Sequence, residues 1–145
     1  MKKTLAFISS DDFSYTFREA LEEKGGFDVS SLKNFAEARE ELSKKKFDII
    51  YIELFGIPVG NVNDISTEEI NKGKHEKKYF GTKLLTDVIR NETSINNKTP
   101  VYILLDSERF GDSKQYLTLG ADDVFIKEKN SYMERIDVMK KQTNQ

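Results

Sequence analysis

Short apolar segments alternate with segments of helical periodicity along the chain, and this alternation is the strongest constraint on its fold. Three segments are almost wholly apolar, which is typical of strands covered on both faces: Leu5–Ile8, Phe47–Phe55 and Pro100–Leu105. Phe27–Leu32 alternates apolar and polar residues, which indicates a strand at a sheet edge. Val124–Ile126 is a shorter fifth candidate. The sequence therefore predicts five strands.

The segments between these strands carry the spacing of amphipathic helices. Phe13, Phe17 and Leu21 recur every fourth residue, as on one helix face. Asp11 and Asp12 precede them and can cap that helix. Similar stripes and capping pairs predict further helices over residues 35–42, 66–72, 84–89, 112–119 and 132–139.

This alternation predicts an α/β domain in which right-handed crossovers join parallel strands. Five strands with intervening helices form the flavodoxin-like arrangement, a three-layer fold with strand order 2-1-3-4-5. All 145 residues fit one such domain. Val59–Lys78, rich in polar residues and glycine, interrupts the pattern after the third strand. We expect this insert to be mobile and to lie outside the core.

The composition excludes several classes of function. A net charge of −2 gives no strong electrostatic case for nucleic acid or a membrane as a partner. The chain has no cysteine and one histidine, His75, which excludes thiol catalysis and histidine metal clusters. Leu5–Ile8 is too short for a secretory signal, so we expect a cytoplasmic protein. The turn Ser9–Asp12 lacks the glycine of a phosphate-binding loop, which argues against a nucleotide or flavin cofactor.

Charged residues of both signs follow the strands, at the edge where their carboxyl ends should meet. We expect three carboxylates, Asp11, Asp12 and Glu53, to lie near Lys127. Convergent carboxylates can hold a divalent cation such as Mg²⁺. The simpler interpretation is that the aspartates cap a helix and that Glu53 pairs with Lys127. The sequence leaves both interpretations open.

Four segments resemble, in their order and spacing, the receiver domains of response regulators. Phe47–Glu53 is similar to the family's third strand, which ends on the phosphate-accepting aspartate. Gly81–Arg90 is similar to its third helix, and Pro100–Leu105 to its fourth strand. Gly120–Lys127 resembles the fifth-strand motif, which ends on an active-site lysine. The resemblance covers most of the chain apart from Val59–Lys78 and implies a role in two-component signalling.

The resemblance places Lys127 on the family's lysine, Glu53 on the acceptor aspartate and Leu105 on the position of a switch hydroxyl. Glu53 is one methylene longer than aspartate, and a misplacement of that order can cost about a hundredfold in rate. Its extra reach could instead bring the carboxylate towards Lys127 and hold the domain in one state. We therefore expect no stable phosphorylation at Glu53.

Two alignments are possible for the acidic pair that helps receiver domains to bind Mg²⁺. An alignment without gaps places Ser9 and Ser10 on that pair. A shift of two residues places Asp11 and Asp12 there but shortens the first helix. A weak Mg²⁺ site formed by the two aspartates with Glu53 is therefore the only cofactor site that the sequence suggests.

These departures favour an atypical receiver domain, without enzymatic activity, that acts through protein–protein contacts and independently of phosphorylation. The alternative is a working phospho-receiver with Mg²⁺-dependent phosphoryl transfer to an acidic residue. A small-molecule-binding domain with the insert as a lid is a third hypothesis, although no motif supports it.

No output domain is evident, so we expect the signal to leave through the surface, towards a signalling protein or a second copy of the chain. Receiver domains commonly use the face formed by the fourth helix, fifth strand and fifth helix. In this chain that face would carry large side chains suited to an interface, Tyr116, Phe125, Tyr132 and Met133. The alternative is that these side chains complete the core.

Overall fold

One five-stranded sheet organises the computed structural model, which describes residues 1–11, 14–109 and 111–143. Its strands are β1 (Lys3–Ile8), β2 (Phe27–Leu32), β3 (Ile49–Glu53), β4 (Val101–Leu105) and β5 (Asp123–Ile126). The strand order is β2-β1-β3-β4-β5, and each neighbouring pair is parallel. The predicted flavodoxin-like topology is confirmed, with β2 at an edge.

The register of the strands decides which residues meet at the carboxyl edge of the sheet. β1 ends at Ile8, which pairs with Ile52 of β3. Ser9 therefore follows β1 beside Glu53, the last residue of β3. Lys127 follows β5 at the same edge. Every residue of β3 and β4 is buried, as the apolar runs predicted.

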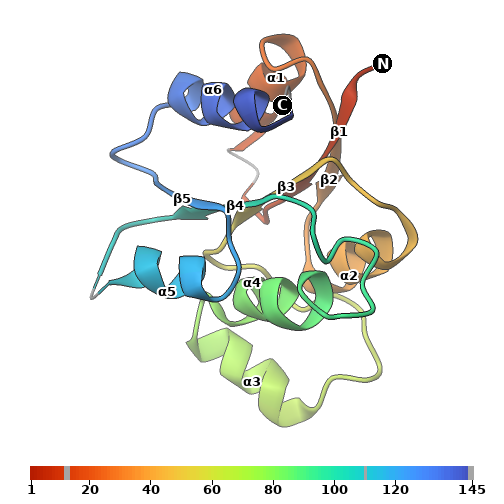
Figure 1. Cartoon of the computed structure of the whole chain (residues 1–145). Helices are drawn as coiled ribbons and strands as arrows, with labels where there is room; N and C mark the ends of the chain where they lie inside the picture. The colour runs from red at the N-terminus through yellow and green to blue at the C-terminus, as the bar shows by residue number, and fades with distance from the viewer. Residues whose placement is uncertain (12–13, 110, 144–145) are drawn as a thin grey trace.

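Helices α1 (Tyr15–Glu23) and α6 (Tyr132–Thr143) cover one face of the sheet (Figure 1). They enclose a cluster rich in aromatic side chains, in which the Phe17 ring lies 5.2 Å from the Tyr51 ring. Gly26, with φ of 70°, turns the chain after α1 into β2, a conformation that suits glycine. None of the helices in the described ranges is long and apolar enough to cross a membrane.

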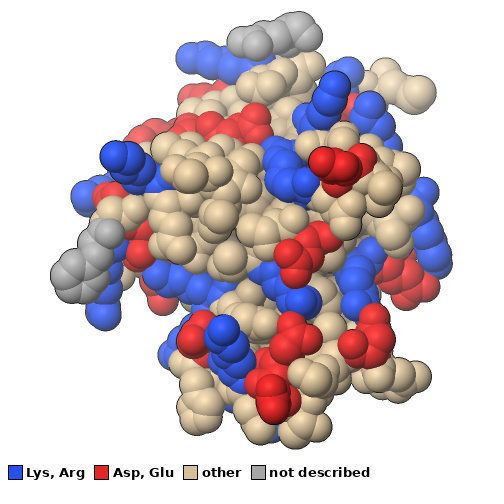
Figure 2. Space-filling view, turned by 60° about the horizontal axis from the view of Figure 1, so that its bottom comes forward, with Lys and Arg blue, Asp and Glu red and all other residues tan. Residues whose placement is uncertain are grey.

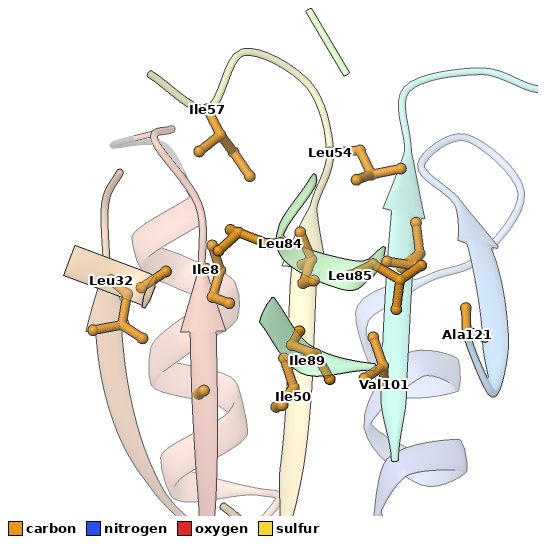
Figure 3. Packing of buried hydrophobic residues seen from close by; sticks show 14 of the residues in the cluster. Ile8, Leu32, Ile50, Leu54, Ile57, Leu84, Leu85, Ile89, Val101 and Ala121 are labelled. Atoms are coloured by element: carbon orange, nitrogen blue, oxygen red, sulfur yellow. The ribbon is translucent and has the colours of Figure 1, made fainter. Parts of the chain in front are cut away.

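The opposite face is covered by α2 (Phe35–Lys44), α4 (Tyr79–Lys83), the π-helical segment η2 (Leu84–Ile89) and α5 (Asp112–Thr118). Leu84, Leu85 and Ile89 of η2 lie against the strands that carry Ile50 and Val101 (Figure 3). All five side chains are fully buried. The two helical layers and the sheet form the predicted three-layer fold.

The insert contains α3 (Thr67–His75), which lies outside α4 and farthest from the sheet (Figure 1). Ser66 caps it by accepting a hydrogen bond from the Glu69 amide at 3.2 Å, as predicted. None of the α3 side chains is buried. Val59 and Ile65 nevertheless pack against the core, so the expectation that the whole insert lies outside the core is wrong.

Backbone contacts also attach the insert to the domain. The Phe35 amide donates to the Pro58 carbonyl at 2.8 Å, and the Ala36 amide donates to the Val59 carbonyl at 2.9 Å. Pro58 and Val59, where the insert begins, therefore supply acceptors for the first amides of α2, which have no partner within the helix. On its other side, Glu69 of α3 accepts from Lys83 of α4 at 2.9 Å.

Two of the four predicted interface residues belong to the core instead. Tyr116 is 3% exposed, and its hydroxyl lies 2.9 Å from the Thr82 hydroxyl. Phe125 is equally buried and stacks on Tyr102. The other two residues do lie at the surface, with Tyr132 40% and Met133 45% exposed (relative accessibilities).

The loop between η2 and β4 is held by a fully buried amide side chain, Asn96. Its Nδ2 donates to the carbonyls of Leu42 and Lys45, each at 2.8 Å. Its Oδ1 accepts from the Phe47 amide and the Thr99 hydroxyl, each at 2.9 Å. The Asn96 side chain thus supplies hydrogen-bond partners for backbone groups at the end of α2 and in the segment that leads to β3.

We expect Asn96→Ala to lower the free energy of unfolding by about 3 kcal/mol, because it leaves several buried polar groups without partners. Asn97→Ala is the matched control, since the Asn97 side chain makes one exposed hydrogen bond to the Glu92 carbonyl. That variant should stay within about 0.5 kcal/mol of wild type. Urea unfolding measures both values, and equal stabilities of the two variants would contradict the role assigned to Asn96.

Candidate functional site

A cavity of about 270 Å³ lies at the carboxyl edge of the sheet, between the sheet and the α1 and α6 layer. The polar residues that line it are Asp11, Ser14, Glu53, Lys127 and Arg135. The predicted convergence of Asp11 and Glu53 near Lys127 is therefore found. Because the structure does not describe residues 12 and 13, the predictions for Asp12 and Phe13 fall outside the described residues.

Glu53, the predicted counterpart of the acceptor aspartate, is buried with 3% of its surface exposed. Its Oε1 accepts hydrogen bonds from the Ser9 hydroxyl, at 2.5 Å, and from the Ser14 hydroxyl. Its Oε2 accepts from the Tyr51 hydroxyl at 3.1 Å. A buried carboxylate is stable only with such donors, and here three hydroxyl groups supply them.

The two serines reach Glu53 because of the way in which α1 begins. Ser14 is the N-cap residue of α1, but its side chain makes no capping hydrogen bond and points to Glu53 instead. The Ser14 amide donates to the Asp11 carbonyl, and the Asp11 amide donates to the Ser9 hydroxyl, each at 3.1 Å. The N-cap of α1 is thus Ser14 and not Asp11.

Ser10 and Leu105, two other predicted site residues, do not contact Glu53 through any described hydrogen bond. The Ser10 hydroxyl donates to the Gly56 carbonyl at 2.8 Å and so binds the turn after β3. The Leu105 side chain is fully buried in the core, and its carbonyl accepts from the Lys127 amide at 2.9 Å. Of the serines at the predicted Mg²⁺-binding positions, only Ser9 faces Glu53.

Lys127 lies at the rim of the cavity and is exposed. Its Nζ lies 5.4 Å from the centre of the Phe55 ring, which is a cation–π contact. Among the described ion pairs, none joins Lys127 to Glu53. The interpretation in which Glu53 forms an ion pair with Lys127 is therefore wrong for the described residues, because the carboxylate is held by hydroxyl donors instead.

Tyr51 and Arg135 also belong to this network, although the sequence did not identify them. The Tyr51 hydroxyl accepts from Arg135 Nη1 at 3.4 Å while it donates to Glu53. Arg135 is 3% exposed, and its Nε donates to the Asn130 carbonyl at 3.1 Å. Tyr51 precedes Glu53 by two residues, a spacing that places both side chains on one side of a strand and could have indicated the contact.

The described residues do not fit a divalent metal site. No group of three histidines or carboxylates in the described part of the chain comes together to hold a metal ion. Asp11 and Glu53 line the same cavity, but both carboxylate oxygens of Glu53 already accept hydrogen bonds from hydroxyl groups. Mg²⁺ requires several free oxygen ligands in near-octahedral geometry, which this pair does not provide.

We expect the stability of the protein to fall above about pH 10, because two buried tyrosines have a higher pKa in the folded protein than in the unfolded chain. Burial and the charge of Glu53 raise the pKa of Tyr51 well above 10.0, and burial raises the pKa of Tyr102 to about 12. Above pH 10 the unfolded state then binds fewer protons than the folded state, so stability decreases as the pH rises. Each tyrosine contributes up to about 1.4 kcal/mol per pH unit.

Tyr51→Phe should make this slope shallower, and Tyr102→Phe should do the same between about pH 10 and 12. At neutral pH, Tyr51→Phe should also cost about 1–2 kcal/mol, since Glu53 loses a hydrogen bond. Guanidinium unfolding across this pH range, followed by circular dichroism, measures both effects. A Tyr51→Phe variant with the wild-type slope would contradict the prediction.

Solved structures of receiver domains are similar to this structure over nearly its whole length. A signal receiver domain of a two-component histidine kinase from Clostridium thermocellum has a TM-score of 0.72 and 16% identity, with 100% of both chains covered. The receiver domain of a sensor histidine kinase from Pseudomonas aeruginosa PAO1, with a magnesium ion coordinated in its active-site cleft, has a TM-score of 0.70 and 14% identity over 100% of both chains.

A response regulator protein from Burkholderia pseudomallei, with a phosphorylated aspartic acid, a calcium ion and citrate, has a TM-score of 0.67 and 17% identity. The similarity covers 99% of this chain and 69% of the Burkholderia pseudomallei chain. No protein-family model matches the sequence, and no curated protein matches it. Topology, coverage and TM-scores agree that this chain has the fold of response-regulator receiver domains.

Proposed function

We propose that this chain is an atypical receiver domain of two-component signal transduction, which acts through protein contacts and without phosphorylation of Glu53. The observation that supports this proposal is the hydrogen bonding of the Glu53 carboxylate to Ser9, Ser14 and Tyr51. A carboxylate that accepts a phosphoryl group has to present an oxygen in line with the donor. Glu53 is buried, and each of its oxygens is already engaged.

Phosphoryl transfer to Glu53 would require the carboxylate to leave its hydroxyl donors. Each lost hydrogen bond to a charged group costs about 1.5–3 kcal/mol. Among the described residues, few groups are placed to stabilise developing charge, because Lys127 contacts the Phe55 ring at the rim of the cavity and the described carboxylates do not gather into a metal site. We therefore infer a signalling module without enzymatic activity.

The proposed partner is a signalling protein in the cytoplasm, with a second copy of this chain as the alternative. Tyr132 and Met133, exposed on the first turn of α6, are the remaining candidates for the contact. On the face drawn in Figure 2, basic and acidic side chains are interspersed and do not form a field of one sign. Such a surface favours a protein partner over nucleic acid.

The second candidate function is a working phospho-receiver, which is favoured by the presence of Asp11 and Lys127 on the same cavity as Glu53. The two functions differ in whether Glu53 accepts a phosphoryl group. We expect that incubation with phosphoramidate and Mg²⁺ gives no phosphoryl adduct on wild-type protein in intact-mass spectra, under conditions that fully modify a receiver domain with an acceptor aspartate.

Glu53→Ala is the control that assigns any adduct to its residue. An adduct on wild type that is absent from Glu53→Ala would overturn the proposal and establish the second function. An adduct present in equal amount on both proteins would lie at another residue; Glu53 would then be unmodified, but phosphoryl transfer to a different acidic residue would favour the second function. Thermal unfolding of both proteins verifies that each is folded during the reaction.

A further inference from the structure

We propose that a second cavity, between the insert and the turn after β3, binds a small amphipathic anion with an apolar body and one carboxylate group. This cavity has a volume of about 480 Å³, within the range of about 300–1,000 Å³ that is usual for small-molecule sites. This inference goes beyond the proposed function and does not depend on whether Glu53 is phosphorylated.

The wall of this cavity is apolar and is partly formed by the core itself. Phe80 and Ile57 are buried core residues, and Val59 packs against them from the start of the insert. Ile70 and Gly73 of α3 close the opposite side. A Cβ atom on Gly73 would lie 2.1 Å from the Phe80 ring, so α3 approaches α4 closely only because this residue is glycine. The insert thus completes a preformed apolar site.

The charges at the rim specify the kind of ligand. Lys74 and Lys77 line the cavity, and Asp106 is the one acidic residue among its lining residues. No described ion pair includes either lysine. The Lys77 carbonyl accepts from the Gly56 amide at 2.9 Å, which fixes the backbone of this lysine at the rim. An apolar wall with an excess of cationic groups at its mouth suits a ligand that carries a single negative charge.

The position of the cavity agrees with the general rule for open α/β sheets, in which ligands bind beyond the carboxyl ends of the strands. Phe55 lines both this cavity and the cavity that contains Glu53. The Lys127 ammonium group contacts the same ring. A ligand against Phe55 would therefore lie one side chain away from the receiver-like site.

The test compares octanoate with octan-1-ol, which has the same chain length and no charge, in ¹⁵N-resolved NMR titrations of the full chain. We expect octanoate to shift the amide signals of Ile57, Val59 and Ile70 and to bind more tightly than the alcohol. The double variant Lys74→Gln/Lys77→Gln should weaken octanoate binding by about two- to thirtyfold, since exposed charge pairs contribute about 0.2–1 kcal/mol each. Its affinity for octan-1-ol should not change.

Lys72→Gln is the matched control on α3, because Lys72 does not line the cavity and should leave both affinities unchanged. Ile70→Trp fills the cavity and should reduce binding of both ligands by at least about tenfold, through loss of the space they occupy. The proposal is overturned if octanoate does not bind at millimolar concentration, if its shifts map to another surface, or if the lysine variant binds both ligands as wild type does.

Discussion

The hydrogen-bonded carboxylate of Glu53 is the interaction on which the functional edge of this domain depends. Removing a charge from water costs several kcal/mol unless donors replace the water, and Glu53 obtains its donors from three different places. Ser9 follows β1, Ser14 is the N-cap of α1, and Tyr51 stands on β3 itself. Arg135 of α6 contacts the same Tyr51 hydroxyl. The positions of two strands and two helices are therefore coupled to one side chain, and a change in its hydrogen bonding would affect all four.

The sequence predicted the fold well because the burial of one face of a helix or strand requires apolar residues at a regular spacing. Phe27–Leu32 was predicted as an edge strand and is β2 in the structure, with the same bounds. The hydrogen bonds of the site require no such regular spacing. Ser14 and Asp11 are equally good helix-capping residues by type, so composition could not show that Ser14 is the N-cap or that its hydroxyl binds a residue far along the chain. By residue type Tyr51 indicates only a strand, since tyrosine is common in strands, and its spacing of two residues from Glu53 is the one signal of the contact.

Two of the four predictions for the surface, Tyr116 and Phe125, failed for a related reason. Tyr116 and Phe125 are large enough for an interface, but periodicity alone does not say whether such a side chain faces the core or a partner. In the insert the error has the opposite sign. Its composition is polar and predicts a surface segment, but two of its apolar residues, Val59 and Ile65, pack against the core. Isolated apolar residues in a polar segment carry no periodic signal, so their burial depends on tertiary contacts that a sequence pattern does not contain.

A receiver fold with a fixed carboxylate needs another way to receive a signal. In the proposed function Glu53 does not change its charge, so a change of state has to come from binding at a neighbouring surface. Phe55 is the side chain best placed to transmit it, since it lines both cavities and its ring contacts the Lys127 ammonium group. Movement of this ring would alter the environment of Lys127 without breaking the hydrogen bonds of Glu53. A ligand in the cavity that the insert completes would then take the place of the phosphoryl group as the signal. The sheet, the helices and the hydrogen bonds of Glu53 would keep their arrangement.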